Sequence, residues 1–170
     1  SLISQGERFT IVTNESSKSD VEVQFLIWVL TRCLDYWKIS KKKLVSGNLT
    51  DEDRQKVKEA EKWWNTKYAK SIKVTSLSDA DARLTCQIIK KDITRYGFSG
   101  YLVDTFKLSM DNGNNDAFWM SLVKDTRNLT EIAMRYNVIG LMTVQLALSS
   151  LNRCWIDASC LSNSKAIKET

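Results

Sequence analysis

Residues 9–15 read Phe9-Thr10-Ile11-Val12-Thr13-Asn14-Glu15, a β-branched and aromatic run that ends in polar side chains. Two later runs have the same form, Gly100-Tyr101-Leu102-Val103-Asp104 and Val138-Ile139-Gly140-Leu141-Met142-Thr143-Val144-Gln145. Short apolar runs of this composition predict buried strands. In an open parallel sheet, ligands bind beyond the carboxyl ends of the strands, so the polar residues that end the three runs are expected to meet in one crevice.

The segments between these runs predict helices. Apolar residues at helical spacing, preceded by capping residues, indicate helices over about 21–36, 50–69, 79–97 and 116–136, and residues 72–75 alternate as a short strand. Strands separated by helices of this length imply βαβ crossovers. The predicted fold class is therefore α/β, with a mainly parallel sheet flanked by helices on both faces.

The composition indicates one packed domain. The chain has 170 residues, of which 43% are hydrophobic, with six Trp and no Pro; this suits a single core built from regular elements. No stretch of the sequence reaches the ~18 apolar residues that a membrane-spanning helix needs. The chain opens on Ser1 rather than Met, so we expect a piece of a longer protein that acts in the cytoplasm.

Charge and residue types limit the chemistry. Lys and Arg number 25 against 20 Asp and Glu, and the pI near 9.0 allows an anionic partner without requiring one. The chain has no His, so acid–base chemistry must come from carboxylates, Lys or Tyr. The four cysteines (Cys33, Cys86, Cys154 and Cys160) are widely spaced, which favours buried or incidental thiols over a metal site.

Five motifs occur in an order that resembles a known family. They are Thr13-Asn14-Glu15 at a strand end, residues 43–50 leading into a helix, the strand that ends in Asp104, Thr143-Val144-Gln145-Leu146, and residues 161–169. Together they resemble the ATPase domain of DnaB-type replicative DNA helicases, most closely phage or mobile-element members. The resemblance implies that residues 1–170 form a single partial RecA-like ATPase domain, equivalent to the C-terminal domain of such a helicase.

The resemblance implies roles for four residues at the strand ends. Glu15 matches the carboxylate that polarises the water attacking ATP, and Gln145 matches a sensor whose amide can donate and accept hydrogen bonds. Asp104 matches the Walker B aspartate that holds Mg²⁺, with Thr143 supporting the nucleotide site. ATP and Mg²⁺ are thus the implied cofactors. The ordinary alternatives are a surface or helix-capping acid for Glu15, a turn cap for Asp104 and a solvated amide for Gln145.

The resemblance also implies that two loops, residues 107–116 and 149–168, bind single-stranded DNA. Ser162, Asn163 and Lys165 align with a segment that grips the DNA backbone, and Arg153 and Lys168 lie close in sequence. Hydroxyls, amides and cations bind phosphates without reading bases, which suits an enzyme that moves along any sequence.

Two other features near these segments have a structural alternative. Trp155 either stacks on a base or anchors packing. The cluster Lys41-Lys42-Lys43 is expected to be a solvated group near a helix C-terminus, where cations are favoured, rather than a DNA patch.

The chain departs from the family at the phosphate loop. No G-x-x-x-x-G-K-S/T motif occurs in it; the resemblance places that loop before Ser1 and a cationic finger after Thr170. The fold is therefore expected to be incomplete at both ends, and this chain alone to hydrolyse essentially no ATP.

The resemblance identifies the chain as part of an ATP-dependent replicative helicase that couples ATP hydrolysis to DNA translocation and unwinding. The complete protein would form a hexameric ring in the bacterial or phage-infected host cytoplasm, with a helicase loader or primase as further partners. The alternative is a non-catalytic RecA-like module that binds DNA or a regulatory partner. A phosphate loop encoded immediately upstream would separate the two.

Overall fold

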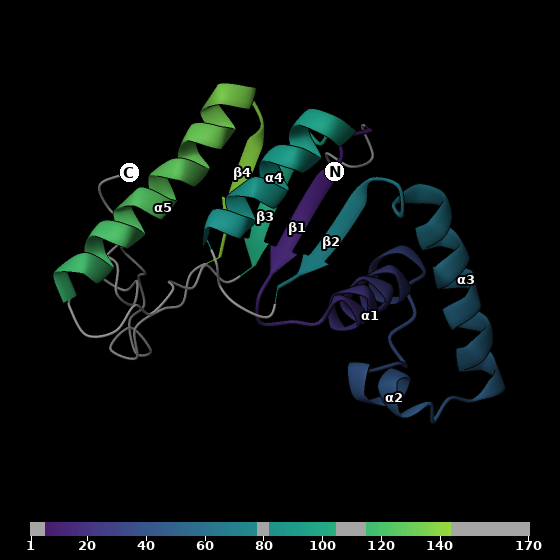
Figure 1. Ribbon diagram of the computed structural model, residues 1–170. Helices are drawn as coiled ribbons and strands as arrows, with labels where there is room; N and C mark the ends of the chain where they lie inside the picture. Colours follow the sequence, from purple (N-terminus) through teal and green to yellow (C-terminus); the bar gives the residue numbers. More distant parts are fainter. Residues whose placement is uncertain (1–5, 78–81, 105–114, 144–170) are drawn as a thin grey trace, which may run out of the picture.

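The computed structural model describes residues 6–77, 82–104 and 115–143 (Figure 1). The elements follow one another as β1 (Phe9–Thr13), α1 (Lys18–Trp28), η2 (Val29–Cys33, a π-helical turn), α2 (Lys41–Ser46), α3 (Asp51–Lys67), β2 (Ile72–Ser76), α4 (Ala82–Tyr96), β3 (Gly100–Asp104), α5 (Asn115–Tyr136) and β4 (Ile139–Met142). Among these described residues, no helix is long and apolar enough to cross a membrane.

The four strands form one sheet in the order β2-β1-β3-β4, and every neighbouring pair is parallel. The α/β prediction with a parallel sheet is confirmed. The register places Thr13 beside Ser76 on one side and beside Asp104 on the other. The carboxyl ends of β1, β2 and β3 therefore lie level at one edge of the sheet.

Helices α4 and α5 cover one face of the sheet (Figure 1). Val12 and Val103 are buried against Ile89 of α4 and Ile132 of α5 in the main hydrophobic cluster. On the opposite face, α1 contacts β2. The β4 side chains of that face remain open to solvent in the described part of the chain, since Leu141 is 51% exposed.

A second hydrophobic cluster holds α1, η2, α2 and α3 together beside β2. Its buried members are Val29, Leu30, Tyr36, Ile39 and Ala60. Aromatic rings extend this cluster between α1 and α3, where Phe25 stacks on Trp64 with ring centroids 4.8 Å apart. This helical unit packs beside the edge strand of the sheet (Figure 1).

The predicted helix over residues 21–36 is wrong in its second half. The α-helix ends at Trp28 and continues as the π-helical turn, after which Asp35 adopts a positive φ of 49°. Tyr36 then turns back, and its hydroxyl donates a hydrogen bond of 2.7 Å to buried Asp53 on α3. This contact between distant segments overrides the local helical pattern.

The expected position of Lys41-Lys42-Lys43 near a helix C-terminus is also wrong. These residues open α2, where the Ser40 side chain caps the helix by accepting a hydrogen bond from the Lys43 backbone. The Lys43 ammonium lies 2.6 Å from Asp53. The cations are thus placed by their carboxylate partner rather than by a helix dipole.

Candidate functional site

Asp104 is at the centre of the carboxyl edge of the sheet, as the last residue of β3. The Thr13 hydroxyl, at the end of β1, donates to Asp104 Oδ2 over 3.3 Å. The Thr143 hydroxyl, directly after β4, donates to Asp104 Oδ1 over 3.2 Å, with the Val103 carbonyl 3.4 Å away as a second acceptor. Each carboxylate oxygen is therefore oriented by a hydroxyl from a different neighbouring strand.

Thr13 also fixes the turn that carries Glu15. The Ser16 backbone N–H donates to the Thr13 hydroxyl over 3.1 Å, and the Asn14 N–H lies 3.4 Å from the Asp104 carbonyl. Glu15 is exposed between these two anchored residues. One fully buried hydroxyl thus connects the Asp104 carboxylate to the turn in which Glu15 is found.

The structure removes one alternative for Glu15. The N-cap of α1 is Ser17, whose side chain accepts a hydrogen bond from the Asp20 backbone over 3.1 Å. Hydrogen bonds from Ser17 and then from Lys41 hold the pKa of Asp20 below its ordinary value. Because Ser17 and Asp20 provide the cap, Glu15 is not the capping acid of α1.

Asn14 is a second polar residue of this turn. Its side-chain oxygen is buried and has no hydrogen-bond partner within the described ranges. A buried acceptor without a donor is costly, so this oxygen calls for a donor from outside those ranges. It lies in the same strand-end turn as Glu15.

The residues around Asp104 fit a magnesium ion. Mg²⁺ prefers oxygen ligands and is typically held by one or two carboxylates together with waters and substrate phosphates. Asp104 supplies one oriented carboxylate, whose two oxygens retain lone pairs beyond those used by the threonine hydroxyls. In the part of the chain that the structure describes, no three His, Cys, Asp or Glu residues are grouped for a metal. The site therefore suits Mg²⁺ better than a fully protein-bound metal.

The structure brings together Asp104 and Thr143 of the predicted site, with Thr13 as a residue that the sequence analysis did not assign. Its signal was a hydroxyl residue at the end of a buried strand, but only the register shows that it faces Asp104. Outside the described residues lie Gln145, Arg153, Trp155, Ser162, Asn163, Lys165 and Lys168, and so does most of the 107–116 loop.

Comparisons with known proteins support the fold. No family model matches the sequence, and no curated protein matches it either. The structure is similar to a solved "ATPase Domain", with a TM-score of 0.75 and 14% identity over 97% of this chain and 57% of that one. It is also similar to a "DnaB-Like Replicative Helicase" solved for its interactions with primase, with a TM-score of 0.69 and 12% identity over 89% of this chain and 35% of that one.

The chain thus spans little more than half of one solved structure and about a third of the other. At these identities the likeness concerns the fold alone. The fold is that found in the ATPase domains of DnaB-like replicative helicases, and the RecA-like prediction is confirmed.

Proposed function

We propose that the chain is part of an ATP-driven DNA helicase, with its hydrolytic residues at the carboxyl edge of the sheet. The observation that carries this proposal is the row formed by Thr13, Asp104 and Thr143, with Glu15 two residues beyond Thr13. Such a row provides an oriented carboxylate for a metal and a second carboxylate for water. The similarity in fold to helicase ATPase domains supports the same function.

In this proposal the two carboxylates have different tasks. Asp104 holds Mg²⁺, which when bound neutralises charge that develops on the phosphates. Glu15 is exposed, and it polarises the attacking water and accepts its proton. The hydroxyl of Thr13 keeps the Glu15 turn and the Asp104 carboxylate in a fixed relation. Gln145, three residues beyond β4, senses the terminal phosphate.

Strands β3 and β4 lead toward the two segments assigned to DNA. Residues 107–116 follow β3, and residues 149–168, which include Arg153, Ser162, Asn163, Lys165 and Lys168, follow β4. Changes at the nucleotide are thereby passed to single-stranded DNA. The complete protein is proposed to act as a hexameric ring in the cytoplasm with ATP and Mg²⁺, and the neighbour solved with primase makes primase a partner to test.

The decisive experiment replaces Glu15 by Gln in the complete protein. The amide keeps the shape but lacks the charge, so we expect ATP turnover to fall by about 10²–10⁴-fold, the usual contribution of a general base, while nucleotide binding persists. Glu22→Gln is the matched control, because Glu22 is an exposed acid on α1 whose contact with Lys18 is a 3.7 Å ion pair. Normal turnover in Glu15→Gln would reject the assignment.

The DNA assignment has its own test. Changing Lys165 and Lys168 to Ala is expected to weaken single-stranded DNA binding equally for all sequences. Each lost phosphate contact should reduce the slope of log K against log salt by about 0.7. Titrations at several salt concentrations measure this slope, and an unchanged slope would place the DNA site elsewhere.

A further inference from the structure

A hollow of about 970 Å³ lies along the edge strand β2, between the sheet and the helical unit. Its wall includes Arg8 before β1, Lys70 before β2, Phe25 of α1, Trp64 of α3 and Tyr96 at the end of α4. Its volume is at the upper end of the ~300–1,000 Å³ typical of ligand sites. Most of these residues precede the strands, so the hollow is remote from the carboxyl edge that carries Asp104. We call it the β2 groove.

Two cations of the β2 groove have no anionic partner among the described residues. The Arg8 guanidinium donates hydrogen bonds to the carbonyls of Lys70 (3.3 Å) and Tyr96, and its central carbon lies 4.6 Å from the centroid of the Phe98 ring. No carboxylate of the described segments forms an ion pair with Arg8 or with exposed Lys70. Within that part of the chain, Arg8 is therefore a rigidly held charge without a counter-ion.

The other two cations of the groove provide a contrast. Lys18 pairs with Glu22 at 3.7 Å, and Lys73 pairs with fully buried Asp92 at 2.5 Å. Their charges are compensated within the protein. The surplus positive charge is thus confined to Arg8 and Lys70, and an oriented guanidinium of this kind is suited to a phosphate.

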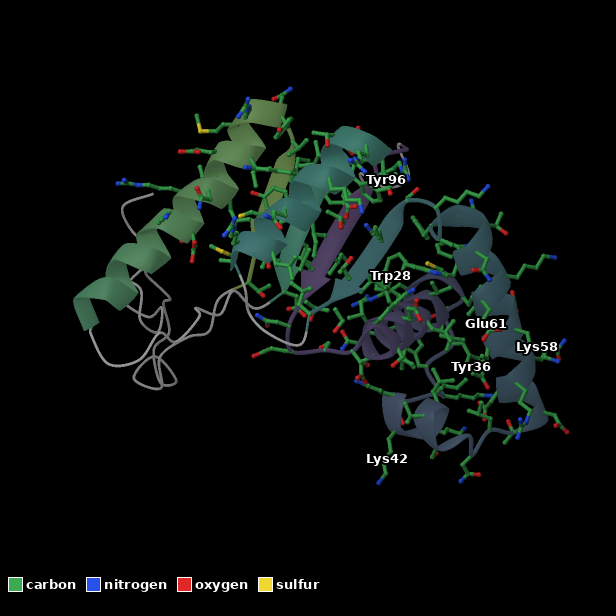
Figure 2. The ribbon with its side chains drawn as sticks, in the orientation of Figure 1. Trp28, Tyr36, Lys42, Lys58, Glu61 and Tyr96 are labelled. Atoms are coloured by element: carbon green, nitrogen blue, oxygen red, sulfur yellow. The ribbon has the colours of Figure 1, made fainter. Side chains whose placement is uncertain are left out.

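Aromatic rings border the same groove. Phe25 and Trp64 form a stacked pair with an interplanar angle of 24°. Tyr96 is 47% exposed at the end of α4, where Figure 2 shows it. Uncompensated cations beside accessible ring faces are the combination with which proteins bind single-stranded nucleic acids, since the cations follow the phosphates and the rings stack on bases.

We propose that the β2 groove is a binding site for single-stranded nucleic acid, separate from the strand-end site and from the loops assigned to DNA above. Phosphates bind Arg8 and Lys70, and a base stacks beside Phe25 and Trp64. The open edge of the groove allows a strand to enter and leave, so one or a few nucleotides occupy it. An acidic peptide would satisfy the charges but would leave the aromatic faces without a stacking partner.

Photo-cross-linking of the 170-residue chain locates the bound strand. The probe is an oligothymidine of about 12 nucleotides, within the range bound by single-strand sites, with 5-iododeoxyuridine at alternate positions. Peptide mapping by mass spectrometry is expected to find adducts at Phe25, Trp64 or Tyr96. Adducts confined to residues 105–116 and 144–170, or none at all, would overturn the proposal. Adducts in residues 149–168 report separately on the helicase loops, so the two proposals can fail independently.

A charge variant provides the second readout. Lys70→Ala is expected to reduce the salt slope of oligothymidine binding by about 0.7, the value for one phosphate contact with a single strand. The matched control is Lys58→Ala, because Lys58 is exposed on the outer side of α3, away from the groove (Figure 2). Equal slopes for both variants would overturn the proposal, as would a polyglutamate peptide that displaces the oligonucleotide while no groove adduct forms.

Discussion

Replacing Thr13 by Val tests whether one hydroxyl joins the two halves of the strand-end site. Thr13 is fully buried, and Val has nearly the same shape, so the change removes two hydrogen bonds with little repacking. One bond goes to the Asp104 carboxylate at 3.3 Å, and the other comes from the Ser16 N–H at 3.1 Å.

The expected cost follows from these two contacts. A hydrogen bond to a charged group contributes about 1.5–3 kcal/mol, and one between neutral groups about 0.5–1.5 kcal/mol. The contact with Asp104 is long for an O–H···O bond, so its contribution belongs at the low end. We expect Thr13→Val to lower the free energy of unfolding by about 2 kcal/mol, which for a chain of this size is about 4–8 °C in Tm.

A double-mutant cycle with Asp104→Ala isolates the shared bond. Urea unfolding of the two single variants and the double variant should give a coupling energy of about 1 kcal/mol, because the second change has no bond left to remove. Thr13→Ser is the control; it keeps the hydroxyl and should lose about 0.8 kcal/mol for one buried methyl group. Additive effects within about 0.3–0.5 kcal/mol would refute a Thr13–Asp104 link.

Two other contacts away from the site give predictions of stability. Thr10 donates a 2.7 Å hydrogen bond to Asp92 with both residues fully buried; Thr10→Val should therefore lower the free energy of unfolding by about 1.5–3 kcal/mol in urea titrations, and an unchanged midpoint would contradict this. Asp53 has a pKa held below its ordinary value of 3.8, first by the Lys43 hydrogen bond; its stabilisation is present above that pH and is lost as the pH falls through the folded-state pKa. Melting curves should show a smaller acid loss in Asp53→Asn than in the wild type.

The sheet was predictable because its strands carry a local signal. β1 and β3 are short β-branched or aromatic runs, and helical segments separate them, which leaves parallel pairing as the simple arrangement. The start of α3 was similarly local. Thr50 accepts a hydrogen bond from the Asp53 backbone, and the Asp53 side chain accepts one from the Thr50 backbone, so a four-residue pattern decides the boundary.

The helical unit beside β2 was less predictable because contacts between separate segments decide it. The π-helical turn and the break at Asp35 bring Tyr36 to Asp53, 17 residues away. Burial and the hydrogen bond to Asp53 raise the pKa of Tyr36 to about 12. A periodicity argument sees only the helix that leads into this segment, so it extends the helix and misplaces the lysines that follow.

The site shows the same division between local and long-range information. Glu15 and Asp104 were expected at strand ends, and the structure places both there, but the part of Thr13 depends on pairing between strands 91 residues apart in sequence. A slip of one residue in β1 against β3 would turn Thr13 to the other face of the sheet.

The register that prevents this slip is set by the core. Val12 and Val103 are paired neighbours on the face covered by α4 and α5, and both are almost fully buried. Because side chains alternate along a strand, burying these two valines forces Thr13 and Asp104 onto the opposite face, side by side. Packing on one face thus aligns the polar residues of the other, and a core substitution that shifts β1 would separate the Glu15 turn from Asp104 without altering either residue.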